Sequence, residues 1–135
     1  MPNQCIEIHD CVLDRILTSN GVTELYFASV YVHQSQGKPG VDPGIGWFQE
    51  AISRIFDVQA PPALSKLPID LANGQTVLGE RISANEIPIP LNYRSKSKLR
   101  LNPAQNPGEI LLFVGSGAEI ALLGEPGEAE NFRPK

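Results

Sequence analysis

The chain has 135 residues, of which 41% are hydrophobic and 19% are charged, and its formal net charge at pH 7 is −4. This length predicts one domain with one core, and the composition excludes a disordered chain. The negative charge argues against a nucleic-acid-binding function. The sequence contains no run of about 18 apolar residues, so it predicts no membrane span. The first residues lack the basic and apolar parts of a signal peptide, so we expect a cytoplasmic protein.

The first third of the chain predicts a β-hairpin. Residues 5–18 and 22–33 are rich in apolar, β-branched and aromatic residues, and Asn20-Gly21 lies between them. Asn-Gly between two such runs favours a type I′ turn, because both residues tolerate a positive φ. The second run is long for one strand, so we expect a bulge or bend within it. We expect Cys5 and Cys11 to be free thiols, since a protein without an export signal seldom forms disulfides.

The next feature is a loop rich in glycine and proline, from Gly37 to Trp47. It holds four of the twelve glycines and the only tryptophan. Glycine and proline together indicate a loop of defined shape, and such loops often carry binding sites. Residues 47–58 allow two interpretations, since their apolar spacing fits either a helix or one face of a strand. If the fold contains a helix, we expect it to be short and to lie there.

The second half of the chain predicts further short strands. A second Asn-Gly pair, Asn73-Gly74, predicts another hairpin between residues 67–71 and 75–82. The prolines of residues 87–91 cannot donate to a ladder, so this stretch is predicted as an edge strand or an extended connection. Five successive apolar residues within 109–114 predict a central strand covered on both faces.

These elements predict an all-β, mainly antiparallel fold, a two-layer β-sandwich or a partly open barrel, because turn residues recur every 8–12 residues or so. Residues 1–123 are predicted to form a single β domain. Residues 124–135 are acidic and contain proline and glycine, which is typical of a loosely held C-terminal tail.

The sequence contains no complete catalytic or cofactor motif. Lys38 is followed by Pro39 where a P-loop requires Ser or Thr, and Gly44-Ile45-Gly46 supplies only the first half of a dinucleotide fingerprint. Ser116 lacks the spacing of a nucleophile elbow and is predicted to lie in a turn. We therefore predict no cofactor and no metal ligands from the spacing of the residues.

Two weaker patterns remain. Glu7 and Asp10 would fall on opposite faces of a regular strand, so their spacing does not indicate paired acid–base catalysis. Four basic residues alternate along one predicted strand, which favours a charged edge strand over a nucleic-acid surface in an acidic chain. These residues are Arg94, Lys96, Lys98 and Arg100.

Two functional hypotheses follow. The first is a non-catalytic binding or protein-interaction module that uses loop 37–47, with Trp47 as an apolar anchor and His33, Lys38 and Asp42 as polar contacts. Its partner is either a small molecule or a second copy of the chain. The alternative is a small enzyme whose site, with or without a metal, is built from His9, His33 and nearby carboxylates.

Overall fold

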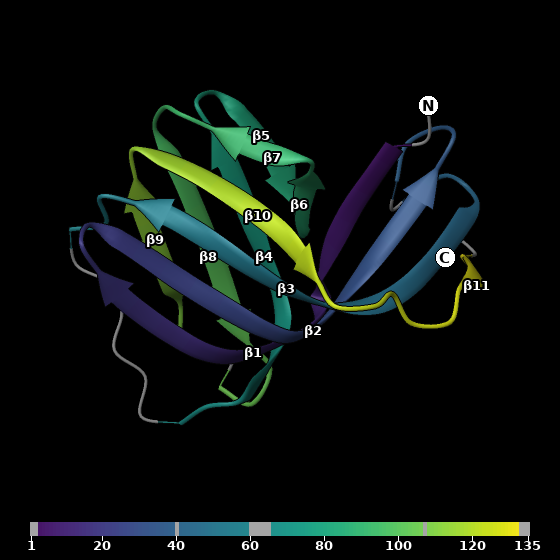
Figure 1. The fold of residues 1–135 in the computed structure, drawn as a ribbon, viewed down its shortest axis with the longest axis horizontal. Helices are drawn as coiled ribbons and strands as arrows, with labels where there is room; N and C mark the ends of the chain where they lie inside the picture. Colours follow the sequence, from purple (N-terminus) through teal and green to yellow (C-terminus); the bar gives the residue numbers. More distant parts are fainter. Residues whose placement is uncertain (1–2, 40, 60–65, 107, 133–135) are drawn as a thin grey trace.

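The computed structural model describes residues 3–39, 41–59, 66–106 and 108–132 (Figure 1). Across these residues the chain forms eleven antiparallel strands and no helix, so the predicted all-β class is confirmed. The strands are β1 (Asn3–Ser19), β2 (Val22–Ser35), β3 (Gly44–Phe56), β4 (Ile69–Leu78), β5 (Arg81–Ala84), β6 (Glu86–Ile89), β7 (Leu91–Tyr93), β8 (Ser97–Pro103), β9 (Leu111–Gly115), β10 (Gly117–Leu123) and β11 (Glu130–Phe132).

All strands belong to one sheet that is not closed into a barrel, an arrangement consistent with a β-sandwich or an open barrel. Its main path runs β7-β10-β3-β2-β1-β4-β8-β9, while β11 pairs with β3, β5 with β4 and β6 with β1. The long strands β1, β2 and β3 bend across the whole molecule (Figure 1). One half of each contributes to the larger part with β4, β8, β9 and β10, and the other half extends beside β11.

The hairpin predicted at Asn20-Gly21 is confirmed. Ser19 of β1 lies opposite Val22 of β2, and both turn residues have positive φ, 53° and 77°. The bend expected in the second arm is also present, as a register shift between Phe27 and Val30 in the pairing of β2 with β3. The local chemistry of the turn therefore determines how the first two strands pair.

Residues 47–58 do not form a helix, because nearly all of them belong to β3. Ala51, Ser53 and Ile55 are buried, whereas the residues between them are half-buried. This alternation has the period of a strand, and β2 and β10 pair with β3 on its two sides. Pairing on both edges stabilises the extended form over the helical one that the apolar spacing also allows.

The second predicted hairpin is wrong in position. Asn73 and Gly74 lie inside β4, which continues to Leu78, and the chain turns instead at Gly79 and Glu80 before β5. Gly79 supplies the positive φ of that turn, 63°. Gly74 serves a different purpose, since a Cβ there would overlap the Arg100 carbonyl oxygen of β8. A glycine inside a strand often marks such a close approach of backbones.

Two further strand assignments are corrected. Residues 109–114 do not form a central strand, because β9 ends the sheet and pairs only with β8, leaving Leu112 and Val114 exposed. Conversely β8, which carries Lys98 and Arg100, is not an edge strand, because it lies between β4 and β9. The proline-containing strand β6 has one paired neighbour on the sheet, β1, as predicted for residues 87–91, and β7 pairs with β10.

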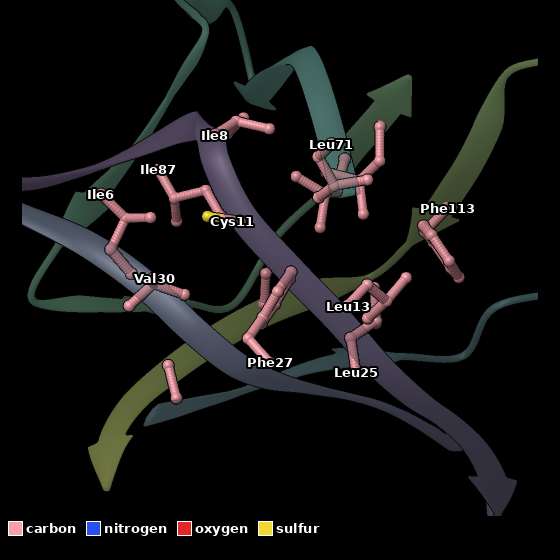
Figure 2. Packing of buried hydrophobic residues seen from close by; sticks show 14 of the residues in the cluster. Ile6, Ile8, Cys11, Leu13, Leu25, Phe27, Val30, Leu71, Ile87 and Phe113 are labelled. Carbon is pink, nitrogen blue, oxygen red and sulfur yellow. The ribbon is translucent and has the colours of Figure 1, made fainter. Parts of the chain in front are cut away.

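The segment after Leu123 contributes β11, which pairs with the start of β3; residues 133–135 lie outside the described part. The core lies between the bent strands, where Phe27, Phe113 and Leu13 are completely buried (Figure 2). Figure 2 shows side chains of β1 and β2 meeting those of β4, β6 and β9. Among the described residues, no helix has the length and apolar character needed to cross a bilayer.

Candidate ligand-binding site

An open cleft of about 940 Å³ lies where the start of β1, loop 37–39 and strands β5 and β6 come together. We call it the polar cleft. The start of β1 provides residues 3–5, and β5 provides residues 81–84; the rest of the lining is Glu86 and residues 88–90. Its volume falls in the range of small-molecule sites, about 300–1,000 Å³. Loop 37–47 therefore contributes to a cleft through its first residues.

Two cations from distant parts of the chain line the polar cleft. Lys38 comes from the loop between β2 and β3, and Arg81 begins β5. Neither side chain forms an ion pair with another described residue. The amides of Asn3 and Gln4 and the hydroxyl of Ser83 add neutral hydrogen-bonding groups. The cleft thus offers positive charge and hydrogen-bond donors to an occupant.

The loop that carries Lys38 is held by hydrogen bonds at both ends. The Lys38 amide donates to Asp42 Oδ2 (2.6 Å), and the Asp42 amide donates back to the Lys38 carbonyl (2.8 Å). Ser35 Oγ donates to the Pro43 carbonyl (3.0 Å), and Asn3 Nδ2 donates to the Gly37 carbonyl (2.8 Å). Asp42 therefore shapes the loop around Lys38, and it is not among the residues that line the cleft. Gly40 lies outside the described residues.

The cleft also contains one carboxylate, Glu86. Burial raises the pKa of Glu86, and this rise is opposed by the positive charge of Lys38 and by the hydrogen bond from the Cys5 thiol. Burial likewise raises the pKa of Cys5 far above its usual value, and the nearby carboxylates of Glu86 and Glu7 raise it further. The Cys5 thiol is consequently protonated at neutral pH and is a poor nucleophile.

His33 lies directly opposite Cys5, which the sequence did not predict. The two residues are cross-strand partners on β1 and β2, so their side chains share one face of the sheet. His33 is completely buried, and burial lowers its pKa. A neutral imidazole beside a protonated thiol lacks the thiolate that cysteine catalysis requires. His33 thus lies beside the cleft-lining Cys5 and is not itself a lining residue.

The imidazole of His9 lies elsewhere on β1. It contacts the side chains of Glu7 and Asp10. His33 instead lies on β2 opposite Cys5, which precedes Glu7 by two residues on β1. The alternative hypothesis of an enzyme built from both histidines therefore stays a prediction.

Trp47 is half-buried and packs against the hydrophobic core, away from the residues that line the polar cleft. Its cross-strand partner on β2 is Val32, whereas Gly46 is the partner of His33. Because neighbouring residues of a strand face opposite sides, Trp47 and His33 lie on opposite faces of the sheet. The indole Nε1 donates to Gln49 Oε1 (2.9 Å). Its role as an apolar anchor for a partner stays a prediction.

The four basic residues considered in the sequence do not join the polar cleft. Arg94 pairs with Glu119 (3.3 Å) and its guanidinium lies over the Phe56 ring at 4.5 Å. Lys98 is exposed on β8, next to Val114 of β9. Arg81 and Glu86 line the cleft but could not be found from the sequence, because no motif connects residues 81–86 with residue 38. A turn predicted at Gly79, in place of the one predicted at Asn73-Gly74, would have placed a strand at residues 81–84.

Both cysteines should resist alkylation in the folded protein. Cys11 is buried, burial raises its pKa to about 12, and its thiol donates to the Glu7 carbonyl (3.4 Å). We expect iodoacetamide at pH 8 to modify the native thiols at least about 100-fold more slowly than the same thiols in urea, because little thiolate is present. Mass spectrometry of timed samples measures both rates. Equal rates with and without urea would contradict the burial of these thiols.

The comparisons with protein-family models, curated proteins and solved structures give no match to this chain. Any assignment of function therefore depends on the geometry of the described residues.

Proposed function

We propose that the protein is a non-catalytic binding module that holds a small anionic molecule in the polar cleft. The observation that carries the proposal is the meeting of Lys38 and Arg81 at one cleft, where no carboxylate of the described residues lies within ion-pair distance of either cation. A carboxylate or phosphate group of the ligand would form ion pairs with these two cations. A guanidinium suits this role, because it forms paired hydrogen bonds with planar or tetrahedral oxyanions.

The remaining groups of the cleft favour a polar ligand over a purely apolar one. Asn3, Gln4 and Ser83 can each hydrogen-bond to hydroxyl or amide groups of a ligand. Glu86, whose pKa is raised, is suited to interact with a donor group of the same molecule. The proline side chains of residues 88 and 90 supply apolar contact at one wall. A small anion with additional hydroxyl or amino groups therefore fits this lining best.

The protonation states of Cys5 and His33 support binding over catalysis. Both groups are uncharged at neutral pH, for the reasons of burial given above, and neither is poised to attack a substrate. A cytoplasmic location, as the sequence predicts, belongs to the proposal and is tested by fractionating cells that express the chain.

The test is titration of the full chain with citrate and with inorganic phosphate, followed by two-dimensional ¹H–¹⁵N NMR. We expect shifts concentrated at residues 3–5, 37–39 and 81–86. Lys38→Ala and Arg81→Ala should each weaken binding by about 10- to 100-fold, since one charge-assisted hydrogen bond contributes about 1.5–3 kcal/mol.

Lys66→Ala is the matched control, because Lys66 is an exposed lysine that does not line the cleft. It should leave the affinity unchanged. Equal weakening by all three substitutions would indicate unspecific charge attraction, and shifts elsewhere in the sheet would place the ligand outside the polar cleft. Either result would overturn the proposal.

A further inference from the structure

A bulge in β1 gathers two carboxylates and an imidazole beside the polar cleft. His9 Nε2 lies 3.0 Å from Asp10 Oδ2 and 3.8 Å from Glu7 Oε2. One ligand-type atom of each residue lies within 4.8 Å of the others. We call Glu7, His9 and Asp10 the bulge cluster. Imidazole nitrogen and carboxylate oxygens are donors that divalent transition metals accept.

The bulge explains why the sequence spacing did not indicate this cluster. Glu7 pairs with Tyr31 of β2, but the next pair is Val12 with Ser29. Four residues of β1 therefore face the single residue Val30 of β2, and the strict alternation of sides is lost. Glu7 and Asp10, which would diverge in a regular strand, both reach the His9 imidazole. Bulges commonly redirect side chains in this way next to functional sites.

The separations within the cluster suit a common metal ion. Ligands at about 2.05 Å from a tetrahedral zinc ion are about 3.3 Å apart. The measured separations of 3.0 and 3.8 Å lie on either side of this value. Glu7 is 7% exposed and is fixed in the sheet, whereas the side chains of His9 and Asp10 are each 41% exposed. An ion there would have a buried ligand below and open positions toward solvent.

Asn85 supplies a second contact of the kind that orients a metal-binding histidine. Its Nδ2 lies 2.7 Å from His9 Nδ1, while its Oδ1 is buried with no hydrogen-bond partner among the described residues. A half-turn of the amide places Oδ1 against Nδ1. Oδ1 then accepts the Nδ1 proton, which leaves the Nε2 lone pair directed at the two carboxylates. Such outer contacts fix the tautomer of histidine ligands.

The backbone of Asn85 is itself held between two strands. Its amide donates to the Gly74 carbonyl of β4 (2.8 Å), and its carbonyl accepts from the Ile8 amide of β1 (3.0 Å). Asn85 also has a positive φ of 58°. The side chain is thus presented to His9 by a fixed turn between β5 and β6.

We propose that the bulge cluster binds one divalent transition-metal ion of the zinc class, with Glu7, His9 and Asp10 as ligands and Asn85 as the residue that positions His9. This site is separate from the proposed anion-binding groups Lys38 and Arg81, so either proposal can fail without the other.

The experiment is calorimetric titration of ZnCl₂ into the chelator-treated full chain without an affinity tag. We expect one ion per chain. His9→Gln and Asp10→Asn should each weaken the affinity by at least about 10-fold, and Asn85→Gly, which tolerates the positive φ, should weaken it by about 10-fold. Asp14→Asn is the control, because Asp14 is an acidic residue of the same strand that contacts Arg15 instead. It should bind zinc normally.

X-ray absorption at the zinc edge separates this site from binding by the two thiols. A shell of nitrogen and oxygen alone is expected. No binding by the wild-type chain, unchanged affinity in His9→Gln, or sulfur in the shell would each overturn the proposal. Circular dichroism of each variant checks that the exposed substitutions leave the fold intact, and the two ligand variants, His9→Gln and Asp10→Asn, give independent readings.

Discussion

Phe27→Ala is expected to lower the free energy of unfolding by about 3–5 kcal/mol, the largest loss among the substitutions considered. Phe27 is completely buried in the middle of β2, where it lies opposite Leu13 of β1 and Ala51 of β3. Figure 2 shows its ring in the centre of the core. The alanine on β3 is too small to fill the space that the ring would leave, and β2 is paired on both sides, so the cavity cannot collapse easily.

Phe48→Ala is the matched control for this prediction. Phe48 is 49% exposed, and its ring contacts Tyr31 edge-on at 5.0 Å. Losing that contact and half-buried surface should cost about 1 kcal/mol. Urea unfolding followed by tryptophan fluorescence measures both variants, since Trp47 is the only tryptophan. Losses of equal size would show that Phe27 does not occupy the core as described.

The parts of the fold that could be predicted are those with local causes. Asn20-Gly21 determines its turn through the φ angles that these two residues tolerate, so the pairing of β1 with β2 follows from four neighbouring residues. Proline likewise marks β6 as an edge strand, because Pro88 has no amide to donate. Neither inference depends on the rest of the chain.

The parts that could not be predicted have distant causes. Residues 47–58 carry both helical and strand periodicities, and only pairing with β2 and β10 decides between them. The apolar run within residues 109–114 predicts a central strand, yet nothing in these residues indicates that the sheet ends at β9. Propensity over a short apolar run therefore cannot place a strand within a sheet.

The residues of the candidate sites also divide into those with local causes and those with distant causes. Lys38 is predicted as a binding residue from the composition of its own loop, and it is one of the residues that line the polar cleft. Arg81 becomes its neighbour only through the pairing of β5 with β4 and of β6 with β1. The bulge cluster depends on a register shift between Glu7 and Val12. A prediction that assumes regular alternation of side chains along a strand cannot include such a shift. Sequence spacing thus finds loop residues more readily than residues assembled by sheet pairing.

Gly74 gives the sharpest test of this distinction between local and distant causes. As the second residue of an Asn-Gly turn it would need glycine for its φ, and alanine would cost about 1 kcal/mol. Within β4 its φ is ordinary, and the reason for glycine is space. A Cβ there would overlap the Arg100 carbonyl oxygen of β8 and approach two atoms of Ile8, Cδ1 and Cγ2, to 3.1 Å.

We therefore expect Gly74→Ala to destabilise the protein by about 3 kcal/mol, the upper end of what overpacking usually costs. The backbone of β8 cannot give way without breaking its pairing with both β4 and β9, and Ile8 is itself completely buried. Gly108→Ala is the control, since nothing lies within 4 Å of a Cβ at that exposed position, and its stability should change by less than about 0.5 kcal/mol. Urea unfolding of the two variants decides the question. A loss of 1 kcal/mol or less at Gly74 would mean that the strands β4 and β8 are not packed as closely as the structure places them. The position of Gly74 would then no longer fix Asn85, whose amide donates to the Gly74 carbonyl and whose side chain contacts His9.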